Sequence, residues 1–377
     1  MNLLDAAANV WDKTVTGHVA NLHRMPREAV VGSPSGILYR YLPRSGVDQI
    51  GGPPVLLVPP LGAPDFAYDL RRGCSLVQHL LLAGRTVYLV DYGPMSFDDR
   101  GLGIENWVDD VVPRMTREVA AETGEDVDLV AWSLGGIFAL LAVAAAAEDS
   151  AAQDGAAAHD GTRGGVGPLP VNTVTVIATP VDITKVPLIA PIRPLAQIAG
   201  GRVVSSIYQA IGSFPAPMVS WAFHLTAVDR LITRPLALLS RLDDRDCLAQ
   251  IEAVDHMMAN MHGYPGRAFG QLFHLLVRGN DLSSGALTLG GRTIALSALD
   301  VPVLVVAGED DVIAPLKSVR RTVELLTGSP EVRYATAPGG HLGVLTGRRA
   351  RDTTWLELDR MLDDHATPTG AKASSGA

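Results

Sequence analysis

Cysteine and positive charge are both scarce in this 377-residue chain. Cys74 and Cys247 are its two cysteines, and their spacing fits neither a metal-binding motif nor a disulfide framework, as is usual in a reducing compartment. The formal net charge of −9 argues against a general nucleic-acid binder, for which a basic face is expected. We therefore expect a cytoplasmic protein with no nucleic-acid partner.

Long hydrophobic runs are also missing. No stretch of about 18 residues is apolar throughout, and no basic segment followed by an apolar one opens the chain. We therefore expect neither a membrane-spanning helix nor a secretory signal. Residues 2–23 do carry apolar side chains at helical spacing, which predicts a helix packed on the body of the protein. The alternative is an amphipathic surface in peripheral contact with lipid, a membrane or a partner.

The composition is that of a globular protein, with 47% hydrophobic and 19% charged residues. Short apolar strands alternate with helices, which predicts an α/β fold with a doubly wound, mostly parallel sheet. The expected strands are 37–42, 55–58, 86–90, 127–132, 171–178, 301–306 and 332–335, and the expected helices are 69–83, 105–123, 134–147, one that ends near 327, and 351–363.

Several segments interrupt this alternation. One is low in complexity and has no apolar period, which predicts a flexible surface insertion. A much longer one has proline-interrupted apolar groups, which predicts a cap over the carboxyl edge of the sheet, where α/β proteins bind ligands. The predicted division is an N-terminal helical segment (1–30), a core (31–182 and 297–365), the flexible insertion (148–168), the cap or lid (183–296) and a disordered tail (366–377).

Ser133 lies in the string Val-Asp-Leu-Val-Ala-Trp-Ser-Leu-Gly-Gly of residues 127–136, between a predicted strand and an alanine-rich helix. Small residues, Ala131 and Gly135, stand two positions before and two after it, as a tight strand–turn–helix requires. Such a nucleophile elbow strains the serine backbone and lifts Oγ clear of the sheet. The alternative is a buried strand followed by a glycine-rich helix start.

A serine nucleophile needs a base within hydrogen-bond reach and an acid that orients the base. Asp311 follows the predicted strand in Gly-Glu-Asp-Asp-Val-Ile-Ala-Pro, with Asp310 as the competing candidate and a surface turn as the alternative. Of the ten histidines, His341 is the one that follows a strand in the last loop of the sheet. The chain order Ser, Asp, His at these strand ends predicts a catalytic triad of Ser133, Asp311 and His341.

Backbone amides are the expected donors to the oxyanion of an acyl-transfer intermediate. One is the N–H of Leu134, and the other comes from the loop after strand 55–58, at Leu61 or Gly62, because the preceding prolines cannot donate. His256 and His262 lie close in sequence but lack companion ligands at metal-site spacing. We expect no metal and no cofactor.

Together these residues resemble the polyhydroxyalkanoate synthase family of α/β-hydrolase-fold proteins, over roughly residues 30–345. The resemblance rests on Val58-Pro-Pro-Leu, Tyr68-Asp-Leu with Ser75, Val87-Tyr-Leu-Val-Asp-Tyr-Gly, Asp99-Arg-Gly-Leu, Trp132-Ser-Leu-Gly-Gly, Ala178-Thr-Pro-Val-Asp, Asn280-Asp-Leu with Gly290-Gly-Arg, Gly308-Glu-Asp-Asp and Gly340-His. It implies a cap inserted before the strand of the catalytic Asp, an acyl-transfer site and a hydrophobic acyl tunnel. The chain is also similar to the hydrolase portion of actinobacterial lipase and acyl-CoA ligase fusions, which favours lipid esters.

Three positions depart from the synthase pattern. The family has a cysteine nucleophile between glycines, and this chain has Ser133 after Ala131; Val312 and Leu316 replace the family's His and Trp. A serine oxyester is less reactive than a thioester and is more readily discharged to water than to a growing polymer. The sequence therefore predicts a serine esterase or lipase for medium- to long-chain acyl esters. The alternatives are a synthase-like acyltransferase that takes acyl-CoA or hydroxyacyl-CoA thioesters, and a non-enzymatic binder of lipid or polymer granules.

Overall fold

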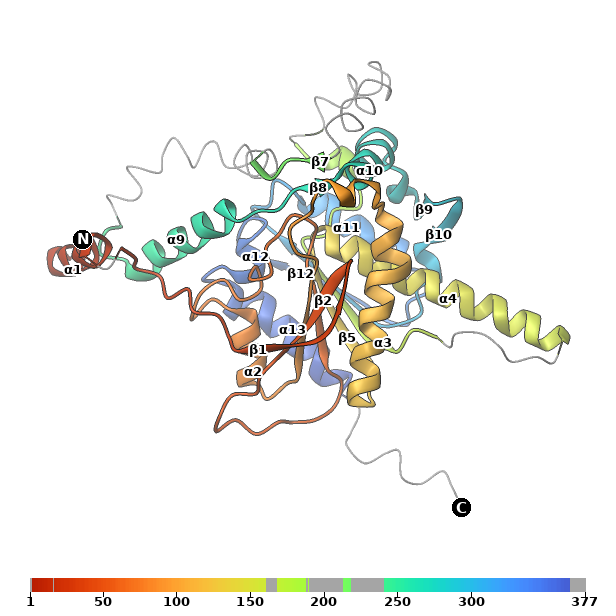
Figure 1. Cartoon of the computed structure of the whole chain (residues 1–377), viewed down its shortest axis with the longest axis horizontal. Coiled ribbons are helices and arrows are strands. Elements are labelled where there is room, and N and C mark those ends of the chain that lie inside the picture. The colour runs from red at the N-terminus through yellow and green to blue at the C-terminus, as the bar shows by residue number, and fades with distance from the viewer. Residues whose placement is uncertain are drawn as a thin grey trace.

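The computed structural model describes residues 2–15, 17–160, 168–187, 189, 213–217 and 241–366. Its centre is an eight-stranded sheet in the order β1-β2-β4-β3-β5-β6-β11-β12 (Figure 1). β2 runs antiparallel to both its neighbours, and the other neighbours pair in parallel. The strands are β1 (Arg27–Ser33), β2 (Gly36–Tyr41), β3 (Val55–Val58), β4 (Val87–Asp91), β5 (Val127–Trp132), β6 (Val171–Ile177), β11 (Val303–Gly308) and β12 (Val332–Ala337).

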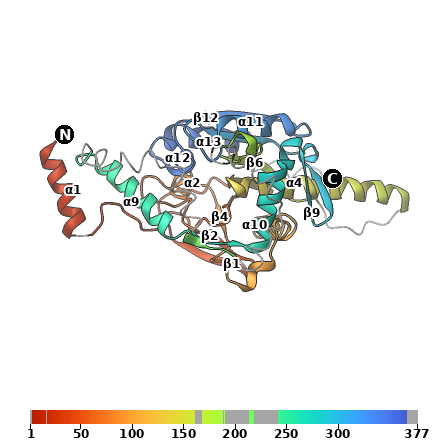
Figure 2. The same ribbon diagram turned by 90° about the horizontal axis from the view of Figure 1, so that it is seen from above.

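Helices cover both faces of this sheet, so the predicted doubly wound α/β architecture is confirmed (Figure 2). On one face, α2 and the turn after it contact α13 through a hydrogen bond between His79 and Asp359 and an ion pair between Arg85 and Asp363. Right-handed crossovers place α3, α4 and α11 on the other face. The core helices are α2 (Leu76–Leu82), α3 (Val112–Thr123), preceded by the π-helical turn η2 (Asn106–Val111), α4 (Leu134–Asp160), α11 (Leu316–Leu325), α12 (Gly343–Thr346) and α13 (Thr354–Asp364).

The predicted helix 69–83 begins later than its apolar spacing suggests. Ser75 caps the first turn of α2 by accepting a hydrogen bond from the Gln78 amide at 2.9 Å. Asp69, at the start of the predicted range, accepts hydrogen bonds from the Met25 amide and the Ser75 hydroxyl instead. Side-chain capping therefore sets this helix start, and 69–75 form turns.

The prediction of a flexible insertion over 148–168 is wrong for residues 148–160, which continue α4. Alanine-rich sequence has high helix propensity even where no apolar period marks a buried face. Two acidic residues also fix the helix to a neighbouring hairpin: Glu148 accepts from the Ala295 amide and Asp149 binds Arg292. Residues 161–167 lie outside the described part of the chain.

α4 also changes the expectation about membrane spans. Residues 134–153, with mean hydropathy 1.5, are long and apolar enough by length and composition to cross a membrane, although Glu148 and Asp149 interrupt them. Within the protein, 67% of that stretch is buried, because the helix packs on β5, β6 and α3. The apolar composition of α4 is thus explained by its place in the core.

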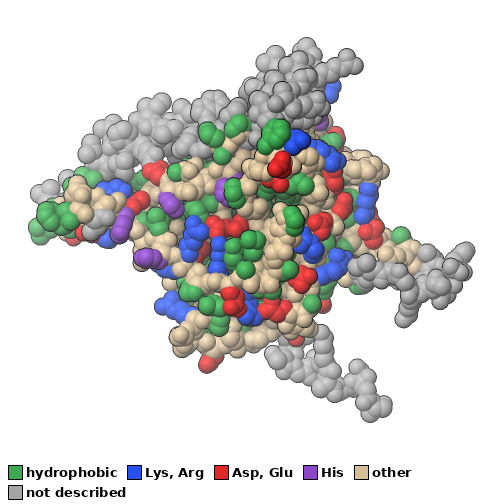
Figure 3. Space-filling model, viewed as in Figure 1, with side chains coloured by type: hydrophobic (Ala, Val, Ile, Leu, Met, Phe, Trp, Pro, Cys, Tyr) green, Lys and Arg blue, Asp and Glu red, His purple; other side chains and the backbone are tan. Residues whose placement is uncertain are grey.

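The N-terminal segment differs from the prediction in two ways. The helix is α1 (Leu3–Val15), and residues 27–30 belong to β1, so the helical segment 1–30 is shorter than predicted and the sheet begins at Arg27. α1 also contacts α9 (Arg245–Ala259) through polar side chains, including Lys13 with Glu252. Its large apolar side chains face outward, with Leu4 81% and Trp11 65% exposed, and hydrophobic side chains gather at this end of the molecule in Figure 3. Packing of the apolar face on the body, as predicted, is therefore not observed.

The described part of the predicted cap, 183–296, lies at the carboxyl edge of the sheet and contains short helices and two small sheets. Its contacts with the core include two backbone hydrogen bonds: the His262 amide donates to the Gly62 carbonyl at 2.8 Å, and the Ala268 amide donates to the Leu102 carbonyl at 3.0 Å. Its described elements besides α9 include η3 (Ile183–Lys185), β7 (Ser213–Phe214), β8 (Tyr264–Pro265), α10 (Gly266–Gln271), η4 (Leu272–Gly279), η5 (Asp281–Ser284), β9 (Ala286–Leu289) and β10 (Arg292–Ala295). The predicted tail lies outside the described residues from 367 onward.

Candidate active site

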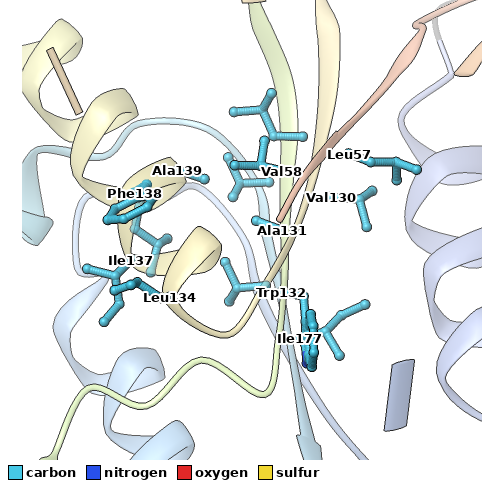
Figure 4. Packing of buried hydrophobic residues seen from close by; sticks show 14 of the residues in the cluster. Leu57, Val58, Val130, Ala131, Trp132, Leu134, Ile137, Phe138, Ala139 and Ile177 are labelled. Atoms are coloured by element: carbon cyan, nitrogen blue, oxygen red, sulfur yellow. The ribbon is translucent and has the colours of Figure 1, made fainter. Parts of the chain in front are cut away.

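Ser133 occupies a sharp turn between β5 and α4, as the sequence predicts. Its φ of 56° lies in the left-handed region, which is costly for a residue with a Cβ and marks strain at functional turns. Gly135 permits the turn, because a Cβ there would stand 2.3 Å from the Val58 carbonyl oxygen. Figure 4 shows buried side chains on both sides of this turn, with Ala131 and Trp132 at the end of β5 and Leu134, Ile137 and Phe138 on α4. The packing of strand against helix therefore holds the serine in its strained conformation.

Three side chains from three strand ends form one hydrogen-bonded chain. His341 Nε2 lies 2.8 Å from Ser133 Oγ, and His341 Nδ1 lies 2.8 Å from Asp311 Oδ2. All three residues are buried, with 8%, 7% and 4% of their surfaces exposed for Ser133, His341 and Asp311. The structure thus brings together the three residues that the sequence selected, in the order nucleophile, base and acid.

Asp311 rather than Asp310 holds the acid position. The side chain of Asp311 faces His341, whereas Asp310 is exposed. Burial raises the pKa of the Asp311 carboxyl. The facing His341 and hydrogen bonds from the Ala314 and Ile313 amides, both at 2.8 Å, outweigh burial and lower the pKa below its usual value. The carboxylate is therefore held ionised beside the imidazole.

The loop that carries His341 is fixed by Trp132, whose role the sequence reasoning missed. The indole Nε1 donates to the His341 carbonyl at 3.1 Å, and the two rings lie 5.3 Å apart. Trp132 directly precedes the nucleophile, so one short segment positions both Ser133 and its base. The position of Trp132 next to Ser133 can be seen in the sequence. Its hydrogen bond to a loop more than 200 residues away cannot.

The predicted oxyanion donors lie on either side of this array. Leu134 begins α4, so its amide belongs to the free N–H groups of a helix start. Leu61 and Gly62 form the centre of a turn closed by the Ala63 amide and the Pro60 carbonyl at 3.4 Å, with Gly62 at φ 83°. Because Gly135 abuts the Val58 and Pro59 carbonyls, this loop runs directly beside the elbow. The assignment of the Leu61 and Leu134 amides stays a prediction.

His256 and His262 make other contacts in the structure. The His256 ring lies 5.0 Å from that of Phe66, and the His262 backbone binds Gly62. Across the described residues, no group of three or more His, Cys, Asp or Glu side chains is arranged to hold a metal ion. The two cysteines are free and buried.

Comparison with known proteins finds similarity to one group of enzymes at sequence level. The chain is 24% identical over 342 residues to the poly(3-hydroxyalkanoate) polymerase subunit PhaC of Allochromatium vinosum, covering 90% of this chain and 88% of that protein. It is 23% identical over 345 residues to PhaC of Thiocystis violacea, covering 90% and 89%. No protein-family model matches the chain.

Solved structures with similar folds include a thermophilic esterase from Thermogutta terrifontis. It is 13% identical, with a TM-score of 0.49 over 91% of this chain and all of that one. The fold assignment itself rests on the strand order, with a serine elbow after β5, an aspartate after β11 and a histidine after β12. The chain thus has an α/β-hydrolase fold and is similar in sequence to polyhydroxyalkanoate synthases.

Proposed function

We propose that this protein is a serine hydrolase that cleaves medium- to long-chain acyl esters through an acyl-enzyme on Ser133. The observation that carries the proposal is the buried Ser133–His341–Asp311 chain, with both links at 2.8 Å. A serine hydroxyl is a weak nucleophile alone, and an adjacent oriented imidazole is what activates it. The strained turn supports the same role, because it presents Oγ at the sheet edge under the cap.

In this mechanism Ser133 Oγ attacks the ester carbonyl carbon while His341 Nε2 takes the hydroxyl proton. The carbonyl π electrons move to oxygen, and nearby amides stabilise the resulting oxyanion. Asp311 stays ionised and holds Nδ1 protonated, which stabilises the imidazolium. His341 then passes the proton to the departing alcohol. Water attacks the acyl-enzyme with the same base and releases the acid.

The preference for hydrophobic acyl groups is supported by the apolar character of the cap side chains that pack on the core. Met257 and Met261 are buried in the main core cluster, and Leu272 and Leu275 pack against it. Methionine and leucine adapt to extended apolar chains, and methionine in particular fills irregular space.

A fluorophosphonate probe tests the nucleophile directly. We expect labelling of the wild type at Ser133, identified by peptide mass, and no labelling of Ser133→Ala. Hydrolysis of p-nitrophenyl esters and triacylglycerols of increasing chain length would then peak at medium to long chains. Equal labelling of both proteins, or a preference for acetyl esters, contradicts the proposal.

A second candidate is an acyltransferase that uses acyl-CoA or hydroxyacyl-CoA. It is favoured by the names of the sequence relatives, which are polymerases of hydroxyalkanoates. The two reactions share the acyl-enzyme and differ in the acceptor that discharges it. Incubation with a hydroxyacyl-CoA and an alcohol separates them: ester product formed faster than free acid favours the transferase. Ser133→Cys in the same assay tests whether a thioester intermediate increases transfer.

A further inference from the structure

Tyr264 of the cap lies directly on the loop that is predicted to supply an oxyanion donor. Its Cζ and hydroxyl oxygen are both 3.3 Å from the point where a Cβ on Gly62 would stand, and the His262 carbonyl oxygen is 3.2 Å from it. Gly62 therefore accommodates the tyrosine ring as well as the positive φ of its turn.

The backbone around Tyr264 is held from two directions. The His262 amide binds the Gly62 carbonyl at 2.8 Å, and Tyr264 pairs with Phe214 in the small antiparallel sheet of β7 and β8. The loop beneath is equally well fixed, because the buried Tyr68 hydroxyl donates to the Val58 carbonyl at 2.9 Å. The Tyr264 ring is therefore held over Gly62 by the backbone contacts of its own segment and by the fixed loop beneath it.

The hydroxyl of Tyr264 is nevertheless unused. Within the described part of the chain it takes part in no hydrogen bond, although the residue is partly buried. Burial raises the pKa of the phenol well above its usual value, so the group stays protonated and able to donate. The hydroxyl is therefore an available donor beside the Gly62 loop, and an oxygen of a ligand that reaches this loop can accept from it.

We propose that the Tyr264 hydroxyl donates a hydrogen bond to the substrate carbonyl oxygen as that oxygen becomes an oxyanion, alongside the backbone amides of the core. This inference rests on the proposed function of Ser133. The tyrosine O–H bond stays intact throughout. The Ser133 proton goes to His341 and then to the departing alcohol, while the carbonyl electrons go to oxygen and re-form the carbonyl as the alcohol leaves. The oxyanion site is then complete only when the cap is seated on Gly62, which links catalysis to cap position.

The test compares Tyr264→Phe, which removes only the hydroxyl, with Tyr334→Phe on β12 as a matched control. The primary readout is the rate of Ser133 labelling by a fluorophosphonate, because its phosphoryl oxygen takes the place of the oxyanion and no turnover is needed. Ester hydrolysis, the inhibition constant of an alkylboronic acid, and thermal unfolding are measured on the same proteins.

For Tyr264→Phe we expect the labelling rate and kcat to fall by about 10²-fold, as for loss of one oxyanion donor. KM and Tm should stay near those of the wild type, boronate affinity should weaken with kcat, and Tyr334→Phe should behave as the wild type. Unchanged labelling and boronate affinity in Tyr264→Phe overturn the inference, as does a loss explained by a lowered Tm. Labelling of Ser133 without turnover of any ester would contradict the proposed function instead, while the ratio of labelling rates still decides the role of Tyr264.

Discussion

Asp128 offers a quantitative test of how burial acts in this core, at the end of β5 opposite the nucleophile. Its side chain is fully buried in the sheet. Oδ1 accepts from the Thr173 hydroxyl at 2.7 Å and from the Asn172 amide at 2.8 Å, while Oδ2 has no hydrogen-bond partner among the described residues. Burial raises the pKa of Asp128 from 3.8 to about 6, against the smaller lowering by the two hydrogen bonds.

The sign and size of the effect follow from linkage. Because the folded protein holds this proton more tightly than the unfolded chain, stability from Asp128 is greatest below its unfolded pKa and is lost as pH rises through about 6. One pKa unit corresponds to about 1.4 kcal/mol, so ionised Asp128 lowers the free energy of unfolding by about 3 kcal/mol at neutral pH. Asp128→Asn keeps the acceptor for Thr173 and removes the titration.

The assay is urea unfolding of wild type and Asp128→Asn across a range of pH. The stability of the variant relative to wild type should increase by about 2 kcal/mol between about pH 4.5 and about pH 7.5. Taking the difference in the free energy of unfolding between the two proteins at each pH cancels the contributions of all other titrating groups. Asp98→Asn, whose side chain is 99% exposed, is the matched control and should show no such increase. A stability difference that does not change with pH would refute the reasoning.

Three further predictions concern the active site and the cap. Asp311→Asn should lower kcat for esters by about 10³- to 10⁴-fold, because the amide no longer holds His341 in the required tautomer; a smaller loss in steady-state kinetics would exclude that role. Gly135→Ala should abolish Ser133 labelling and lower Tm, since its Cβ meets backbone at 2.3 Å, whereas Gly101→Ala, with open space around it, should leave both unchanged. Asn280→Gly should destabilise the protein by about 1–3 kcal/mol in urea unfolding, because it removes the side-chain bonds to Asp182 and the Ile183 amide but keeps the left-handed backbone of Asn280. A neutral result would show that these bonds do not secure the base of the cap.

The central sheet and the active-site array could be predicted because their signals are local. Buried parallel strands read as continuous apolar runs, and each site residue follows such a run at the carboxyl edge. The elbow needs small residues at fixed offsets, so Ala131 and Gly135 identify it without any knowledge of the partners. Chain order then selects Asp311 and His341 from many acidic residues and ten histidines.

Features that depend on distant partners could not be predicted in this way. β1 alternates poorly and is mostly exposed, since it is an edge strand fixed by pairing with β2, and its sequence resembles a loop. The continuation of α4 through residues 148–160 depends on alanine propensity and on contacts to Arg292 and Ala295, which are far away in sequence. The packing of α1 was predicted wrongly for a different reason. Apolar residues at helical spacing indicate an amphipathic helix, but they do not show whether the apolar face is covered by the rest of the protein.

The active-site geometry does not by itself separate a hydrolase from a polymerase. The same base, acid and backbone donors activate either a serine or a cysteine, and the described array around His341 contains nothing that selects the acyl acceptor. What differs is the atom at position 133. An oxyester on Ser133 is a weaker acyl donor than a thioester, so discharge requires the strongest available stabilisation of the second oxyanion. A protonated phenol over Gly62 supplies additional stabilisation there, in a site that already has the two predicted amides. Serine at position 133 and Tyr264 above the loop therefore belong together, because the less reactive oxyester intermediate is the one that gains most from an extra donor when its acceptor attacks.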